Sequence, residues 1–512
     1  MQVTIDSSIR LSASSLPSAT LEQILAALTI PNPEKATAIR EMLWGAKDLP
    51  DDIYLYSRNG DELTLPRGFY GQLVQGLSAY GMEAEWIDYR RDLEFFPLTK
   101  EPDPETGFRL SLDPIRLRDY QSPAVKALVE YEQGVLEMQT GGGKTSVCLE
   151  AIRQVNQPAL IIVDKASLAE QWRERIRKQL GAQAGYIGES ITDVRPITVA
   201  LRQSLWARFD ELSRPQWNLL DLVEGNFWDL WAVVAVDEVH HVVADTLSTI
   251  VQQFPARRRW GLSATPRRDP ELWPLTQAVI GPVIHRTGEE ELGGALVKPT
   301  VHVLRSDFEF DYRPTQMLDK VDPMTGMTII SQRTRKPVQM RIQNNYGDMV
   351  KTLCADDHRN SMIVAEIERL VDEERHVLVV SRRKQQLRNL SSRMSGVLVQ
   401  ELYGGESGDR KREVEDAIEQ AESGSVLLST VAEEGLDIPR LDVVFIVFPM
   451  RNPEVFKQIV GRVMRPHPSK TRADVYDVCD ERVGLLKDQF RERRNLLYVR
   501  SRYEVVDAAT IG

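Results

Sequence analysis

The chain has 512 residues, 42% hydrophobic and 27% charged, with a net charge of −11 and a pI near 5.4. This composition is typical of a globular protein with several domains of about 100–200 residues each. It argues against a uniformly basic nucleic-acid-binding chain but leaves room for a local basic groove.

The sequence also gives expectations about cellular location and metal binding. The longest apolar runs, such as Val443–Phe448, are far shorter than the roughly 18 residues that span a bilayer. The first residues lack the pattern of a signal peptide. Cys148, Cys354 and Cys479 have no metal-binding spacing. We therefore expect a cytoplasmic protein with no structural metal and no membrane association.

Residues 1–111 predict a small α+β domain. The stretch Asp52–Gly68 predicts a β-hairpin with its turn around "RNGDE". Helical periodicity with a glycine stop follows over Phe69–Gly81. Met82–Arg90 then reads as another strand.

Residues 112–295 predict a doubly wound α/β domain. Continuous apolar runs at Pro158–Asp164, Trp231–His241 and Arg258–Pro266 indicate strands buried on both faces, as in parallel sheets. Helix-length amphipathic segments such as Ser167–Leu180 separate them. Polar clusters follow the runs directly, and parallel sheets bind ligands at the carboxyl ends of their strands.

The same pattern recurs over residues 341–500, in the runs His376–Arg383, Gly424–Pro439 and Asp442–Pro449. We interpret this region as a second α/β domain. The polar segment 296–340 is expected to be a connector or insertion, and 501–512 a short tail.

The stretch "MQTGGGKTS" (Met138–Ser146) predicts a phosphate-binding loop between a strand and a helix. Met138 stands where the strict pattern has its first glycine. Gly141, Gly142 and Gly143 would therefore form the tight turn. Lys144 would reach the β- and γ-phosphates. The alternative is a flexible turn followed by a surface lysine.

The pair Asp237-Glu238 follows an apolar strand in the same domain. Metal-assisted phosphoryl transfer needs such carboxylates: Asp237, with the Thr145 hydroxyl, to hold Mg²⁺, and Glu238 to polarise the attacking water. The alternative is a helix N-cap pair. The two clusters together favour ATP hydrolysis with Mg²⁺.

The pattern "DEVH" (Asp237–His240) resembles the DEAH-type second motif of superfamily 2 helicases, and "MQTGGGKT" their first motif. "LRDYQ" (Leu117–Gln121) resembles the upstream element whose Arg118 and Gln121 would read the adenine. The resemblance implies that the nucleotide contacts run through the phosphate loop, at Thr140, Gly141, Gly142, Gly143, Lys144, Thr145 and Ser146.

Further motifs appear in the family's order. "GLSATPRRDP" carries Ser263 and Thr265, which by resemblance couple hydrolysis to domain motion together with His240. Alone, the two hydroxyls would more often belong to a turn or cap. "ITVALRQSL" resembles a segment that touches the tracked strand, here through Gln203 and Ser204.

Motifs five and six lie in the second domain. "QIVGRVMRP" resembles the sixth motif, whose Gln458, Arg462 and Arg465 would close on ATP, and the spacing of the two arginines places both on one face of a helix. The alternative is a solvated basic helix face. "STVAEEGLDIP" resembles the fifth motif, which implies nucleotide contacts at Gly435 and Asp437. Nucleic-acid contacts are implied at Arg382, Ser429 and Thr430.

Within the superfamily, "RRWGLSATPRRD", "GPVIHR" and "DDHRN" resemble the xeroderma pigmentosum group B type DNA helicases and the phage branch-migration helicases. The resemblance implies two tandem RecA-like domains behind the small N-terminal domain. It also implies an ATP-dependent helicase or translocase acting on duplex, forked or branched DNA in repair, recombination or branch migration, with one strand tracked in the interdomain cleft.

The N-terminal domain resembles the duplex-binding domain of the phage enzymes. A DNA surface would use Arg67, Phe69, Tyr70, Arg90 and Arg91, and the alternative is a packed α+β module. Two other functions stay open, an RNA helicase and the motor subunit of a restriction or defence complex. We expect a monomer, alone or with a protein partner. His241 has no role that the sequence supports.

Overall fold

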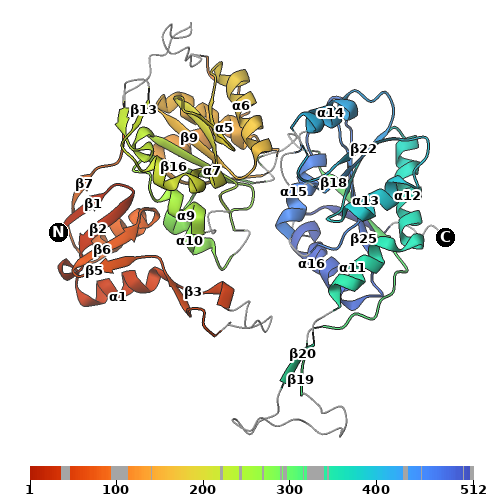
Figure 1. The fold of residues 1–512 in the computed structure, drawn as a ribbon, viewed down its shortest axis with the longest axis horizontal. Helices are drawn as coiled ribbons and strands as arrows, with labels where there is room; N and C mark the ends of the chain where they lie inside the picture. The colour runs from red at the N-terminus through yellow and green to blue at the C-terminus, as the bar shows by residue number, and fades with distance from the viewer. Residues whose placement is uncertain are drawn as a thin grey trace. The chain divides into compact units, whose positions relative to one another are not determined.

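The computed structural model describes residues 1–35, 47–93, 113–139, 141–219, 223–240, 245–267, 270–288, 291, 297–314, 316–319, 339–342, 345–406, 408–430, 436, 438–450, 453–499 and 501–507. The chain divides into two compact units (Figure 1). Unit 1 comprises Met1–Pro33 and Pro50–Gly293, and unit 2 comprises Glu34–Leu49 and Gly294–Gly512.

The N-terminal part of unit 1 is a mixed five-stranded sheet in the order β5-β6-β2-β1-β7. Apolar residues alternate along its strands, so that Val3, Ile5, Ile9 and Leu11 face a core shared with two helices. Its elements are β1 (Gln2–Ile5), β2 (Ser8–Ser12), η1 (Ala13–Ser15), α1 (Ser18–Ala27), β3 (Thr29–Pro31), β4 (Asp52–Tyr54), β5 (Ser57–Asn59), β6 (Glu62–Pro66), η2 (Arg67–Phe69), α3 (Tyr70–Ala79) and β7 (Glu85–Asp88).

The hairpin expected over Asp52–Gly68 is shorter than the sequence suggested. β5 and β6 pair around a turn at Gly60, whose φ of +60° suits glycine. The first part of the stretch, β4, pairs with β3 instead. An alternating pattern specifies a strand but not its partner, and here the partner lies more than 20 residues upstream.

The rest of unit 1 is built on an eight-stranded sheet, β11-β10-β12-β9-β15-β16-β8-β17, whose neighbours are parallel apart from the β10–β11 pair. Successive residues of β9 enter two different cores, Ile161 one and Ile162 the other. Its elements are α4 (Gln121–Tyr131), β8 (Gln133–Met138), α5 (Lys144–Val155), β9 (Ala159–Val163), α6 (Ala166–Leu180), β10 (Gly185–Gly188), β11 (Ile191–Asp193), β12 (Ile197–Leu201), α7 (Arg202–Ala207), α8 (Phe209–Leu212), β13 (Trp217–Leu219), β14 (Val223–Gly225), η3 (Phe227–Leu230), β15 (Val233–Asp237), α9 (Asp245–Val251), β16 (Arg258–Ser263), α10 (Trp273–Val279) and β17 (Val283–Thr287).

Unit 2 holds a seven-stranded sheet, β22-β23-β21-β24-β25-β18-β26, in which every pair is parallel. The predicted fold class of two tandem doubly wound domains is confirmed. Its elements are β18 (Pro299–Arg305), β19 (Gln316–Asp319), β20 (Gln339–Ile342), α11 (Tyr346–Ala355), α12 (Asp357–Asp372), β21 (His376–Val380), α13 (Lys384–Ser391), β22 (Leu398–Leu402), α14 (Gly408–Glu419), β23 (Ser425–Ser429), β24 (Val443–Ile446), α15 (Pro453–Val463), β25 (Ala473–Cys479), α16 (Gly484–Arg493), the π-helix η5 (Arg494–Val499) and β26 (Glu504–Asp507).

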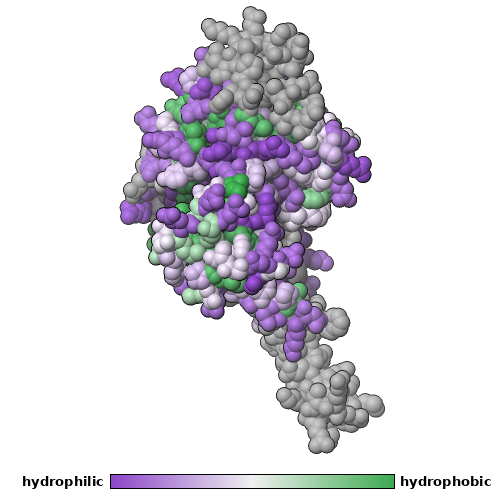
Figure 2. All heavy atoms as spheres, turned by 90° about the vertical axis from the view of Figure 1, so that its left-hand side faces the viewer, coloured by the Kyte–Doolittle hydropathy of each residue, from purple (hydrophilic) through white to green (hydrophobic). Residues whose placement is uncertain are grey.

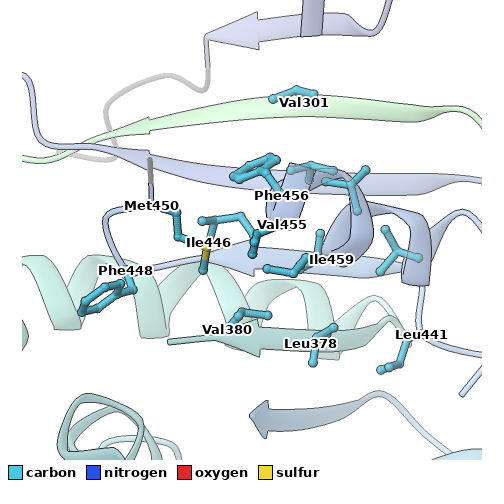
Figure 3. Packing of buried hydrophobic residues seen from close by; sticks show 14 of the residues in the cluster. Val301, Leu378, Val380, Leu441, Ile446, Phe448, Met450, Val455, Phe456 and Ile459 are labelled. Atoms are coloured by element: carbon cyan, nitrogen blue, oxygen red, sulfur yellow. The ribbon is translucent and has the colours of Figure 1, made fainter. Parts of the chain in front are cut away.

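Helix α15 is anchored on this sheet by its apolar face. Val455, Phe456 and Ile459 belong to one buried cluster with Val380 of β21 and Ile446 of β24 (Figure 3). The opposite face of β21 enters a second cluster. Because the helix that carries Gln458 and Arg462 rests on two central strands, its position within unit 2 is well defined.

Two segments that the sequence assigned outside the second domain are strands of its sheet. β18 falls in the expected connector 296–340, and β26 falls in the expected tail 501–512. β18 pairs with β25 on one side and with β26 on the other. The correction has a physical reason: β18 alternates buried and partly buried residues, so it lacks the continuous apolar run that marked the central strands. β26 is a mostly exposed edge strand.

The N-terminal sheet is joined to the large sheet of unit 1 through Arg67, which is fully buried. Its guanidinium donates to the carbonyl oxygen of Ala256, to that of Arg257 at 2.5 Å and to Gln133 Oε1 at 2.8 Å. Next to it, a Cβ on Gly68 would lie 2.0 Å from the Gln277 carbonyl oxygen. The two parts of unit 1 therefore meet in close backbone contact.

The N-terminal part of the chain has a hydrophilic outer side and an excess of acidic residues. Seen from the side on which Figure 1 draws the N-terminal sheet, it is mainly hydrophilic with small, separate hydrophobic areas (Figure 2). Counted along the sequence, residues 1–93 contain 13 Asp and Glu against 8 Lys and Arg. The overall charge of this part is thus unfavourable for a nucleic-acid backbone.

Candidate nucleotide-binding site

The loop between β8 and α5 has the conformation that a phosphate loop needs. Gly141 and Gly143 have φ of +84° and +89°, a region that favours glycine. The Gly142 amide donates to the Gln139 carbonyl oxygen at 2.9 Å, and α5 begins at Lys144. A helix N-terminus at the end of a glycine-rich turn offers backbone N–H groups and a positive dipole to an anion. Thr140 lies outside the described residues.

Gln121 is packed directly against this loop. Its Nε2 donates to the Gly142 carbonyl oxygen at 2.8 Å, and its Oε1 accepts from the Arg118 amide at 2.8 Å. The Tyr120 hydroxyl donates to the same carbonyl at 3.1 Å. A Cβ on Gly143 would lie 2.2 Å from Gln121 Nε2. The upstream motif therefore braces the loop, and glycine is required at position 143.

The two predicted carboxylates stand at the end of β15, close to Lys144. Asp237 Oδ2 accepts from Trp172 Nε1 at 2.8 Å, and its Oδ1 accepts from the Glu238 amide at 3.0 Å. Lys144 Nζ lies 4.0 Å from Glu238 Oε1 and donates to the Met138 carbonyl oxygen at 3.4 Å. Glu238 has a φ of +47°, a strained conformation for a residue with a side chain.

Glu238 is connected to the next strand end by two side chains. His240 Nδ1 lies 3.1 Å from Ser263 Oγ and 3.4 Å from Glu238 Oε2, and Ser263 Oγ donates to the same carboxylate oxygen at 3.4 Å. The Thr265 amide donates to Ser263 Oγ at 3.0 Å. The predicted coupling residues are thus brought together around one carboxylate.

These residues fit a magnesium nucleotide. Asp237 and the partly buried Thr145 are both oxygen donors, which Mg²⁺ prefers. Lys144 supplies the cation that a polyphosphate needs. The Ser146 hydroxyl, also predicted here, accepts from Gln179 Nε2 at 2.9 Å. What the arrangement offers is an anion cradle beside a carboxylate that can orient water.

In unit 2, the residues of the predicted sixth motif lie together, but not on one helix. Arg462 and Arg465 donate through Nη1 to the Leu436 carbonyl oxygen, at 2.7 Å and 3.2 Å. α15 ends at Val463, so the expectation that both arginines share a helix face was wrong. Pro466 explains the difference, because the residue before a proline is disfavoured in helical geometry.

Gln458 is 3% exposed, and neither of its amide atoms has a hydrogen-bond partner among the described residues. An unpaired buried amide costs about 1–3 kcal/mol. The side chain therefore has donor and acceptor capacity for a further group. Gly435 and Asp437 lie outside the described residues.

Two families match parts of the chain. The family described as the res subunit of type III restriction enzymes matches residues 114–268, and the helicase conserved C-terminal domain matches residues 359–467. The first match contains the phosphate loop and the carboxylates, and the second contains Gln458 and both arginines.

Relatives that match most of the chain are named as DNA translocases and helicases. The chain is 27% identical over 408 residues to DNA 3'-5' translocase XPB2 of Sulfurisphaera tokodaii, covering 73% of this chain and 86% of the relative. It is 26% identical to DNA 3'-5' helicase XPB of Kineococcus radiotolerans, covering 78% and 66%. The fold is similar to that of Dbp5 of S. cerevisiae, with a TM-score of 0.51, 13% identity and coverage of 77% and 90%.

This chain is a superfamily 2 helicase, close to the XPB type. Helicases of this family use ATP, usually with Mg²⁺, and bind nucleic acid. Among the helices that the structure describes, none is long and apolar enough to cross a membrane.

The predicted nucleic-acid contacts of this helicase differ in exposure. Gln203 and Arg382 are exposed, whereas Ser204 is 8% exposed and Ser429 is fully buried. Thr430 Oγ1 accepts from the Gly404 amide at 3.0 Å. Gln203, Arg382 and the partly buried Thr430 are thus accessible to solvent, whereas the Ser204 and Ser429 side chains are enclosed by the protein.

The DNA surface suggested for the N-terminal domain is not present as predicted. Arg67 is fully buried and Phe69 is 7% exposed. Arg90 pairs with Asp88 at 2.7 Å and with Glu132 at 3.2 Å. Sequence spacing does not distinguish an arginine that binds DNA from one that joins two parts of a protein.

Sequence reasoning missed three residues that brace the site, Tyr120, Trp172 and Gln179. Trp172 and Gln179 lie on α6, whose apolar face is buried against the sheet. A tryptophan at such a position reads as a core residue, and no pattern in the sequence reveals its hydrogen bond to Asp237. Tyr120 had a visible signal, since it adjoins Gln121 within "LRDYQ".

Proposed function

We propose that the protein is an ATP-dependent DNA helicase or translocase that acts on duplex, forked or branched DNA. One observation carries the proposal: Lys144 Nζ, the Asp237-Glu238 pair and the Ser263–His240 pair converge at neighbouring strand ends of one parallel sheet. The names of the XPB relatives, a DNA translocase and a DNA helicase, support DNA as the substrate.

In this proposal the chain's own residues divide the work. Lys144 and the amides of the glycine loop bind the β- and γ-phosphates, and Glu238 orients the attacking water. Asp237 and Thr145 would hold Mg²⁺, which would supply positive charge to neutralise the phosphates. His240 and Ser263 hold the Glu238 carboxylate in one orientation. Because Ser263 ends β16 and Glu238 follows β15, a movement of either strand end would move this carboxylate.

Gln458, Arg462 and Arg465 are proposed to contact ATP, with Gly435 and Asp437. A cation supplied to the transferring phosphoryl group typically contributes a factor of about 10³–10⁵ in rate. Arg118 is proposed to contact the adenine. Gln203, Arg382 and Thr430 are proposed contacts to the tracked strand, as hydroxyl, amide and guanidinium groups commonly bind phosphates without reading sequence.

The biological setting proposed here is DNA repair, recombination or branch migration in the cytoplasm. The protein is proposed to act as a monomer, alone or with a protein partner.

The test is the rate of ATP hydrolysis with no nucleic acid, single-stranded DNA, duplex DNA, forked DNA or RNA. We expect stimulation by duplex or forked DNA that is lost in Lys144→Ala, with Lys126→Ala, an exposed lysine of α4, as the matched control. Stimulation by RNA alone would replace the proposal with an RNA helicase. A forked substrate with labelled strands then separates unwinding from translocation.

A further inference from the structure

The short segment after α15 folds back onto the end of that helix. It reads Arg465-Pro466-His467-Pro468-Ser469-Lys470, with prolines at alternate positions that restrict the backbone. The Lys470 amide donates to the His467 carbonyl oxygen at 2.9 Å, and His467 Nδ1 lies 2.7 Å from Ser469 Oγ. This tight turn returns the Lys470 side chain to the residues that precede it.

The Lys470 ammonium contacts the end of the arginine-bearing segment. Its Nζ donates to the Arg465 carbonyl oxygen at 2.7 Å and to the Val463 carbonyl oxygen at 3.0 Å. The carbonyl oxygen of Met464, which lies between them, accepts a hydrogen bond from the Val297 amide at 2.8 Å. The last carbonyls of a helix lack partners within it and attract cations. Lys470 thus holds the backbone on both sides of the helix end.

Lys470 also lines a small polar cavity of about 160 Å³. The cavity is lined by Glu374, His376, Glu422, Ser423, Arg440, Asp442, Ser469 and Lys470.

Burial lowers the pKa of Lys470 to about 8, and repulsion from Arg465 and Arg375 acts in the same direction. Asp442 and Glu419 oppose the change. An ordinary lysine has a pKa near 10.4 and stays charged in any neutral buffer.

We propose that Lys470 is a positioning residue for ATP hydrolysis: its ammonium holds the backbone of Arg465 and thereby sets where the Arg465 guanidinium can reach. The proposal rests on the proposed role of Arg465 and deepens it. The side chains of Arg462 and Arg465 both donate to the Leu436 carbonyl oxygen. Lys470 contacts the backbone of Arg465 directly, so loss of this contact acts on the Arg465 guanidinium. Loss of the ammonium charge weakens both bonds to the carbonyls, and hydrolysis falls as pH rises through the pKa of Lys470.

The experiment compares wild type, Lys470→Met, Lys470→Arg and Arg465→Ala in DNA-stimulated ATP hydrolysis from pH 6.5 to pH 9.5. A displacement of about 1 Å at a catalytic group can cost about 100-fold in rate. We therefore expect Lys470→Met to lower kcat by about 10- to 100-fold while KM for ATP changes by less than about twofold, because the interaction acts in the transition state. Lys487→Met, an exposed lysine of α16, is the matched control and leaves kcat unchanged.

The pH profile separates positioning from mere support of the fold. Wild type loses rate above about pH 8, whereas Lys470→Arg, which stays charged, keeps its rate to pH 9.5. An identical decline of wild type and Lys470→Arg with pH would overturn the proposal. This comparison does not depend on whether Lys470→Met folds. Full activity of Arg465→Ala would instead remove the proposed role of Arg465. Loss in Arg465→Ala with an unaffected Lys470→Met would remove only the role of Lys470.

Discussion

Trp172 Nε1 donates a hydrogen bond of 2.8 Å to Asp237 Oδ2, which joins the core of α6 to the carboxylate that is expected to hold Mg²⁺. Trp172 is 2% exposed, so the bond is protected from water. Groups that orient a metal-binding carboxylate commonly contribute 10–100-fold in metal affinity or activity.

We therefore predict that Trp172→Phe keeps the fold but raises the Mg²⁺ concentration for half-maximal ATP hydrolysis by about tenfold. The measurement is ATP hydrolysis across a Mg²⁺ titration. Trp228→Phe is the control, since Trp228 is also buried and donates to Ser213 Oγ at 3.0 Å, away from the carboxylates. An unchanged Mg²⁺ requirement in Trp172→Phe would show that the bond serves packing alone.

Lys144→Ala and Glu238→Gln are predicted to abolish ATP hydrolysis for different reasons. Loss of the Lys144 ammonium removes charge that binds the phosphates, so nucleotide affinity falls as well. Glu238→Gln keeps the shape of the side chain but not the charge that activates water, so nucleotide binding persists. Equilibrium binding of a labelled nucleotide beside a hydrolysis assay distinguishes the two, and turnover at the wild-type rate in either variant would refute the assignment.

Arg67→Met is predicted to destabilise unit 1 by about 3 kcal/mol or more, because it leaves buried carbonyl oxygens without donors. Urea unfolding measures the change, and Arg58→Met at an exposed edge strand serves as the control. Removal of residues 1–111 exposes the same contact surface. We therefore expect the deletion to destabilise the ATPase domain, so it is not a clean test of DNA binding by the N-terminal part. A stability of Arg67→Met equal to wild type would mean that the contact is dispensable.

His376 is predicted to make unit 2 sensitive to acid. Burial, with repulsion from Arg440, lowers its pKa to about 4 from an unfolded value near 6.5. Between these values the unfolded chain binds a proton that the folded chain does not. The associated stability is therefore complete above pH 6.5 and is lost as pH falls towards 4, by up to about 3 kcal/mol.

Hydrogen exchange of the β21 and β24 amides at pH 7.5 and pH 5 measures this loss. His376→Gln keeps a partner for Ser425 Oγ, which lies 2.8 Å from His376 Nδ1, and it should flatten the pH dependence. The exposed His358→Gln should leave it unchanged. A slope retained in His376→Gln would assign the acid sensitivity to another group.

The central strands and the nucleotide loop were predictable because their signals are local. A strand buried on both faces is apolar at almost every position, as β9 is throughout and β21 is after His376. A phosphate loop needs glycines at adjoining positions. The strands β18 and β26 escaped prediction because one is partly exposed and the other lies at a sheet edge. Arg67 was misread because a buried arginine and a DNA-binding arginine have the same sequence pattern.

By itself, the sequence determined the two parallel-sheet domains, the phosphate loop and the order of the helicase motifs, since each depends on residues close together in the chain. The tertiary structure decided which side chains brace that chemistry. Trp172 meets Asp237 across 65 residues, and Arg67 meets Ala256 across 189. Each of these hydrogen bonds joins a donor and an acceptor of a kind that occurs many times in the sequence. Only the packing of the helices and strands determines which donor meets which acceptor.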